Sequence, residues 1–398
     1  MAGSLRLIDL RPARFATAVV GSLILALTTA ATVRADEEPE RGVADESAAP
    51  TTASAETGAG DPAADMPASE APPARAGRAS PPAPIGTRFP EPLEGKQMRV
   101  RYQYKRAKFQ GLLIADRDAR PGFVRNDQFI PYVETPRALD VSTHLVEVAY
   151  APHPRTTLVL QVPFIQKDLE TLEGDTAYRR RDQTDGVGDI TMALVVPFIR
   201  KGRESSHIHI AFDIPTGDIR KQDPAGNRLP YDSQIGNGTV DFEWGWTYRG
   251  ERDWLSWGGQ AIGRHALEEN GLDFREGSRF EASLWSGVRV IGGLSASVRV
   301  QWQKQNNLHG HDRQFDKVVL ANPNPPPANL NLPNDPSENG KARGGTSFLL
   351  GPSLAYDFSG PLTGQRLAVE VSVPVYQNLD GPQLEQDWSL TTGWQWAF

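Results

Sequence analysis

The segment SLTTGWQWAF at residues 389–398 alternates larger, mostly apolar residues with small or polar ones. Side chains of an extended strand point alternately to opposite faces, so Phe398, Trp396, Trp394 and Leu390 share one face. The other face carries only small or polar residues. The segment therefore predicts a β-strand with one side against apolar surroundings and the other against water.

The same period of two recurs along the chain after residue 95, where no stretch keeps a convincing helical period. In residues 207–214, for example, Ile208, Ile210 and Phe212 alternate with polar or small residues. We identify twelve such runs, at residues 97–105, 141–151, 156–166, 187–199, 207–214, 239–249, 254–264, 279–290, 294–304, 346–358, 365–375 and 387–398.

Most of these runs are about 10 to 13 residues long. A membrane-crossing β-strand needs roughly 9 to 11 residues, whereas a strand of a soluble sheet typically has about five or six. Short connections, such as 152–155 and 250–253, alternate with long ones, such as 106–140 and 305–345. This pattern predicts an all-β fold, a transmembrane antiparallel β-barrel of about 12 strands over residues 96–398, with short periplasmic turns.

A soluble β-sandwich is the alternative fold, but it leaves unexplained the large aromatic residues near the ends of the apolar faces. A terminal aromatic residue on an amphipathic strand also resembles the C-terminal signal that the outer-membrane insertion machinery recognises. We therefore expect the chain in the outer membrane of a Gram-negative-type cell, with membrane lipid and that machinery as partners. The sequence leaves the oligomeric state open.

Residues 1–35 have the pattern of a secretory signal peptide, because Arg6, Arg11 and Arg14 precede an uncharged stretch. We expect cleavage before Asp36; an uncleaved membrane anchor is the alternative. Residues 36–95 are rich in alanine, proline and acidic residues and contain almost no large apolar side chain. Such a segment buries too little surface to offset its ordering entropy, which predicts a disordered, acidic periplasmic tail. The tail is a spacer or, alternatively, a weak binding arm.

The polar faces of the predicted strands indicate which residues line the lumen. Charges of both signs occur there, can pair across strands in a wet interior, and predict no strong ion selectivity. The lumen-lining residues that we predict are His207, His209, Asp213, Asp241, Glu243, Arg264, Arg279, Glu281, Arg289, Arg299, Arg366 and Glu370. The two histidines share a face with Asp213 and read as polar lining or, alternatively, as a metal or substrate site.

Composition excludes several other classes of function. The net charge of −7 provides no basic field for nucleic acid. The absence of cysteine rules out disulfides, thiolate metal sites and cysteine nucleophiles. The HGHD stretch at 309–312 has zinc or copper ligands, but its spacing is common by chance and a solvated loop is favoured. We predict neither a cofactor nor a bound metal.

An enzymatic barrel needs a serine and a histidine within hydrogen-bond reach, with a polar residue that orients the imidazole. No Gly-x-Ser-x-Gly occurs, and no phospholipase signature is apparent. We therefore expect no enzyme activity and keep an outer-membrane lipid hydrolase as the less favoured alternative.

Three stretches resemble the family called MetA-pathway of phenol degradation, a transporter-like group of outer-membrane proteins. They are TDGVGDITMALVVPF at 184–198, IPTGD at 214–218 and QIGNGTVDFEWGWTY at 234–248. The resemblance covers about residues 180–265 and implies a barrel that passes small hydrophobic or aromatic compounds.

The sequence thus predicts passive transport of small molecules, hydrophobic or aromatic ones included, through a charged lumen. A non-transporting structural or binding barrel is the alternative. A segment that plugs the bore would favour binding, and a continuous polar channel would favour transport.

Overall fold

The computed structural model describes residues 80–125, 132–173, 178–312, 315 and 335–398. The alternation seen in the sequence appears as an alternation of exposure along the strands. In β7 (Glu204–Ile214), Ile208 and Ile210 are exposed on the outer surface, whereas His207 and His209 are buried within the barrel. In β8 (Asp241–Glu251), Trp244 and Trp246 are exposed in the same way. The outer face is therefore apolar and the inner face polar, as a lipid-embedded barrel requires.

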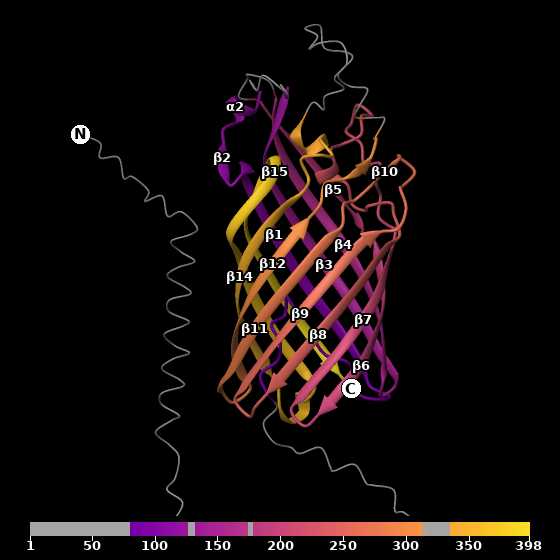
Figure 1. The fold of residues 1–398 in the computed structure, drawn as a ribbon, viewed down its shortest axis with the longest axis vertical. Coiled ribbons are helices and arrows are strands. Elements are labelled where there is room, and N and C mark those ends of the chain that lie inside the picture. The colour runs from indigo at the N-terminus through magenta and orange to yellow at the C-terminus, as the bar shows by residue number, and fades with distance from the viewer. Residues whose placement is uncertain (1–79, 126–131, 174–177, 313–314, 316–334) are drawn as a thin grey trace, which may run out of the picture.

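Antiparallel strands form one closed sheet in the order β15-β14-β12-β11-β9-β8-β7-β6-β4-β3-β1, and β15 pairs with β1 to complete the barrel (Figure 1). Closure leaves no open sheet edge in the hydrocarbon region. The remaining bounds are Met98–Ala115 for β1, Glu134–His153 for β3, Thr156–Glu173 for β4, Ile190–Lys201 for β6, Leu255–Ala266 for β9, Arg279–Ile291 for β11, Leu294–Gln305 for β12, Gly345–Asp357 for β14 and Gln365–Ala397 for β15.

The 33 residues of β15 fill two positions in the barrel. The part from Arg366 to Leu379 pairs with β14, and the part from Leu379 to Ala397 pairs with β1. The chain turns between them near Gly381, whose φ of 98° lies in the left-handed region that glycine tolerates best. Eleven closing strands in the described residues thus provide twelve barrel positions, which confirms the predicted number.

Several strands are longer than their apolar pattern predicts. β1, β3 and β4 continue into the predicted loops 106–140 and 167–186, and β5 (Arg179–Val187) pairs with the upper part of β4. Beyond the apolar belt the outer face becomes polar. There Arg106 donates to Asp140 at 2.6 Å, and Arg181 pairs with Asp168. The hydrophobic alternation disappears where both faces meet water, so the sequence pattern misses these extensions.

The three glycine-rich stretches that resemble the family meet at one end of β6, β7 and β8. Asp189 accepts hydrogen bonds from the backbone N–H groups of Gly217 and Asn237, both at 2.9 Å. A Cβ on Gly217 would lie 2.6 Å from the Cα of Gly236, so the two backbones pass too closely for any side chain. These motifs therefore build a structural junction between adjacent strands.

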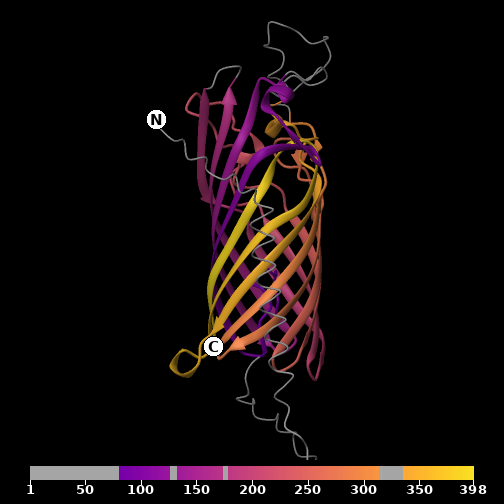
Figure 2. The ribbon, with the colours of Figure 1, turned by 90° about the vertical axis from the view of Figure 1, so that its left-hand side faces the viewer.

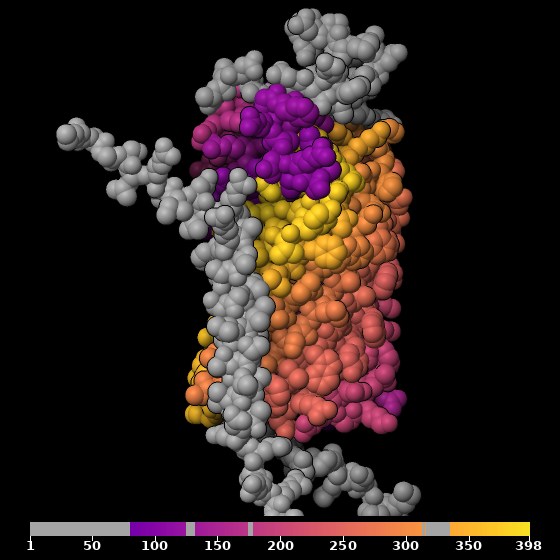
Figure 3. All heavy atoms as spheres, turned by 60° about the vertical axis from the view of Figure 1, so that its left-hand side comes forward, coloured from indigo at the N-terminus to yellow at the C-terminus, as the bar shows by residue number. Residues whose placement is uncertain are grey.

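Small elements cover the end with the long connections. They comprise β2 (Arg117–Ala119), α2 (Pro121–Arg125), η1 (Tyr231–Ser233), β10 (Phe274–Arg275), β13 (His309–Gly310) and η3 (Pro336–Glu338), and η4 (Gly360–Leu362) lies in a short turn at the other end. Figure 2 shows the C-terminus at the end with the short turns, and Figure 3 shows β14 and β15 side by side on the outer wall. Within the described ranges, no helix combines the length and apolarity needed to span a membrane.

Candidate functional site in the barrel lumen

Residues 80–95, which we name the lumenal segment, lie inside the barrel. Phe89 is only 1% exposed and packs with Leu93 against small apolar side chains on the inner face, among them Ala149, Ala151 and Ala211. The composition of residues 36–95 predicts a disordered tail, but residues 80–95 pack against the inner face of the barrel. The reason is that the segment carries a few large apolar side chains and the lumen offers a patch that receives them. Residues 36–79 lie outside the described residues.

Polar contacts also hold the lumenal segment in place. Arg88 donates to Glu243 at 2.6 Å, and the Gln260 amide donates to the Arg88 carbonyl at 2.6 Å. Nearer the short turns, Glu91 pairs with Arg249 at 2.6 Å. That guanidinium lowers the pKa of Glu91 to about 2 against the opposing effect of burial. The segment is therefore docked by a small apolar cluster and by ion pairs that water or a ligand can replace.

The predicted histidines contact this segment directly. His207 Nε2 lies 2.8 Å from the Phe89 carbonyl oxygen, which gives the imidazole a hydrogen bond to the segment. His209 Nε2 lies 3.2 Å from a Glu243 carboxylate oxygen, and its ring packs edge-on against Phe89. The described residues contain no group of three or more metal-ligating side chains suited to a metal ion. The structure therefore places both imidazoles where they position the lumenal segment.

The other predicted carboxylates and arginines form pairs across the lumen wall. Arg264 bridges Asp213 and Asp241 at 3.1 and 2.7 Å. Arg279 pairs with Glu281 at 2.7 Å. Further along the wall, Arg299 pairs with Glu370 at 2.5 Å, and this carboxylate also accepts from Gly86 of the lumenal segment.

Two predicted residues lie apart from this group. Arg366 and Arg289 both approach Asp357, at 2.5 and 3.9 Å, close to the short turns. All twelve predicted residues lie on the inner side of their strands, yet only part of the set lines one cavity.

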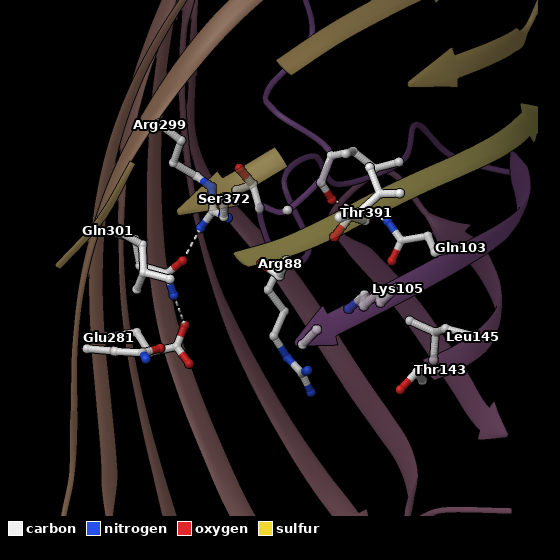
Figure 4. A pocket seen from close by; sticks show the side chains of 18 of the residues that line it. Arg88, Gln103, Lys105, Thr143, Leu145, Glu281, Arg299, Gln301, Ser372 and Thr391 are labelled. Atoms are coloured by element: carbon white, nitrogen blue, oxygen red, sulfur yellow. Dashed lines mark hydrogen bonds between the residues drawn. The ribbon is translucent and has the colours of Figure 1, made fainter. Parts of the chain in front are cut away.

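That cavity has a volume of about 420 Å³ and lies in the lumen beside the tip of the lumenal segment. Its polar wall combines neutral side chains such as Gln103 and Thr143 (Figure 4) with charged ones, most of which are cationic. The cations are Arg88, Arg101, Lys105, Arg264, Arg279 and Arg299, against the two carboxylates Glu243 and Glu281. Leu145, Ile262 and Leu349 add apolar patches to the wall.

Three of these cations, Arg88, Arg101 and Lys105, are not among the twelve predicted lumen-lining residues. Arg88 lies in the segment that was predicted to be a tail, so its place in the lumen depends on tertiary packing. Lys105 lies at the end of the predicted run 97–105, on the polar face. The alternation with Tyr102 and Tyr104 was the available signal, because it places Lys105 on the inner side.

The HGHD stretch lies at the barrel end with the long connections. Asp312 is buried and pairs with Arg228. The Arg228 guanidinium lies over the rings of Phe315, Tyr231 and Phe274, at 4.8, 5.4 and 5.4 Å. Asp312 therefore packs within an aromatic and arginine cluster, whereas His309 and His311 are exposed, as expected for a solvated loop.

A serine–histidine contact occurs on the opposite side of the wall. Ser278 Oγ lies 2.9 Å from His265 Nδ1, next to the ring of Phe280. In the part of the chain that the structure describes, Ser278 is the only hydrogen-bond partner of that imidazole. The contact lacks the third group that orients the base in a hydrolytic triad.

Comparison with known proteins places the fold. No family model matches the chain, and no curated protein matches it. An outer membrane channel from Pseudomonas putida F1 aligns with a TM-score of 0.51 and 11% identity, over 78% of this chain and 98% of that one. A FadL homologue from Pseudomonas aeruginosa gives a TM-score of 0.35 at 8% identity, over 75% of this chain and 89% of that one. The CymD monoaromatic hydrocarbon channel gives 0.34 at 8% identity, over 77% and 89%.

The chain has the fold of an outer-membrane β-barrel. The likeness to the first of these structures carries this conclusion, and the two weaker ones add nothing to it. No family match supports the finer resemblance to the phenol-degradation family. Fold by itself leaves the solute and the activity open.

Proposed function

We propose that the protein is a passage for small solutes across the outer membrane, restricted by the lumenal segment. One observation carries the proposal: a polar cavity of about 420 Å³ lies inside a membrane barrel, next to a segment that only non-covalent contacts hold in the lumen. Charged side chains around a cavity in a hydrophobic shell cost free energy unless water or a solute in the cavity solvates them. The fold shared with an outer membrane channel is consistent with this function.

The lumenal segment sets the conductance in this proposal. Its contacts are one apolar cluster, the Arg88–Glu243 and Glu91–Arg249 pairs and a few hydrogen bonds. Such contacts rearrange without breaking the backbone ladder of the barrel, so the segment can shift while the strands stay paired. Solutes would be small, and the apolar patches at Leu145 and Leu349 suit hydrophobic or aromatic bodies.

A binding barrel is the second candidate, because a segment inside the bore is the feature expected of a barrel that does not transport. The two functions differ in what happens when the segment is removed. We therefore propose to delete residues 82–93 and to measure single-channel conductance in planar bilayers. The passage function predicts a several-fold rise in conductance, and an unchanged conductance would favour the binding barrel.

A second variant tests motion of the segment in the full-length chain. The chain contains no cysteine, so cysteines introduced at Arg88 and Gln260 are the only thiols. Joining them with a short bifunctional thiol reagent should hold conductance at its lowest level, and reductive release of the linker should restore it. Each single-cysteine variant, treated in the same way, is the matched control.

A further inference from the structure

The charges around the cavity are unevenly balanced. Each of the five lining arginines has a carboxylate partner, as Arg101 has in Glu147 and Arg88 in Glu243. The remaining cation, Lys105, has no hydrogen bond or ion pair with any other residue in the described ranges. Its side chain is exposed to the cavity, which leaves one uncompensated positive charge at the wall.

Strand register places two threonines directly opposite Lys105. Lys105 on β1 lies directly opposite Thr143 on β3 and Thr391 on β15. Directly opposed residues of an antiparallel pair have Cβ atoms about 4.5 to 5.5 Å apart. All three side chains line the cavity, and Figure 4 shows them together with Arg88. The row thus combines an ammonium with two hydroxyl donors.

The surroundings of this row fit an organic anion better than a simple inorganic ion. Two residue pairs along the strands, on the same face, Gln103 lies opposite Leu145, so an apolar side chain borders the row. The cavity volume of about 420 Å³ falls in the range of roughly 300 to 1,000 Å³ that small-molecule pockets occupy. A ligand with one carboxylate and one ring matches the donors, the apolar border and the volume together.

We propose that the lumen binds small organic carboxylates, with the carboxylate on Lys105, Thr143 and Thr391 and the apolar body against Leu145. This inference rests on the proposed passage function, for which it names the substrate class. It also revises the expectation that the lumen has no strong ion selectivity. The carboxylates that balance the arginines are already engaged, so the unpaired ammonium decides the sign of the solute.

The test measures binding separately from transport. Benzoate and the uncharged benzyl alcohol are titrated into the full chain in detergent micelles, and binding is followed by ligand-observed NMR. Benzoate should bind at least tenfold more tightly than benzyl alcohol. Lys105→Gln should weaken benzoate at least tenfold, whereas Lys105→Arg should retain most of the affinity.

Lys108→Gln is the matched control, because Lys108 is on the same strand but on the opposite face, three residues away. It should change benzoate affinity less than twofold. Thr143→Val provides a second lumen variant should Lys105→Gln fail to fold, and it should weaken benzoate without affecting benzyl alcohol. Equal affinities for the two probes, or a Lys105→Gln variant with unchanged benzoate affinity, would overturn the assignment.

Conductance separates this inference from the function on which it rests. A rise in conductance on deletion of residues 82–93, without selective benzoate binding, would leave the passage intact and refute the anion site. Selective binding of benzoate without any rise in conductance would support the site and refute the passage.

Discussion

Replacing Phe89 with alanine should undock the lumenal segment and leave the barrel folded. Phe89 is 1% exposed, packs in a cluster with Leu93 and Val159, and meets the His209 ring edge-on at 4.9 Å between centroids. It is the largest apolar side chain in that cluster. None of its contacts belongs to the hydrogen-bond ladder between strands. The substitution should therefore weaken the docking of the lumenal segment and leave the strand pairing intact.

The size of the effect follows from the burial. Truncation of a buried phenylalanine to alanine typically costs about 3–5 kcal/mol, and about 1.4 kcal/mol corresponds to a factor of ten in an equilibrium constant. The docking equilibrium should therefore shift by roughly two to nearly four orders of magnitude. A segment with a docking free energy of a few kcal/mol would then be mostly undocked.

Hydrogen exchange of residues 80–95, followed by mass spectrometry in detergent or nanodiscs, measures this shift directly. Conductance on the same preparation should rise, and the urea midpoint of the barrel should stay close to that of the wild type. Phe212→Ala is the control, since Phe212 is exposed on the outer face of β7 and has no part in docking. Unchanged exchange in the segment, or a barrel that unfolds with it, would refute the reasoning.

Three further predictions concern the wall and the pH dependence. Trp244 is 40% exposed on the outer face, so Trp244→Arg should lower the free energy of unfolding in lipid by about 2–4 kcal/mol if it lies near the midplane. Glu243→Gln should loosen only the lumenal segment. Equal losses of stability for the two variants in urea-dependent refolding would contradict this. Glu147→Gln should destabilise the barrel by about 3–5 kcal/mol, because the fully buried Glu147 is the shared partner of Arg99 and Arg101. Glu170→Gln, which changes a half-exposed carboxylate, is the control. Equal urea midpoints for the two variants would refute the prediction. The pKa of Glu91 is lowered to about 2 from 4.5. Its contribution to docking is therefore complete above about pH 4.5 and is lost as the pH falls toward 2. Conductance should rise over that pH range, and Glu91→Gln should abolish this pH dependence.

The sequence alone determined the barrel and its two faces. A strict period of two with an apolar side admits one arrangement in a membrane, since every backbone polar group must pair within a closed sheet. Because the period is local, residues such as Ile208 and His209 could be assigned to opposite faces without any structure. The motif glycines at 217 and 236 were visible too, although only the structure showed that their backbones touch.

Tertiary structure decided what the lumen contains. Phe89 and Leu93 are four residues apart, but Pro90 and Pro92 between them argue against a helix, so nothing local marks them as buried. Their partners are alanines and valines from β3, β4, β6 and β7, which meet only when the barrel closes. The unpaired charge of Lys105 is likewise a property of the assembled wall, because an ammonium is free only after the carboxylates of neighbouring strands have taken other partners.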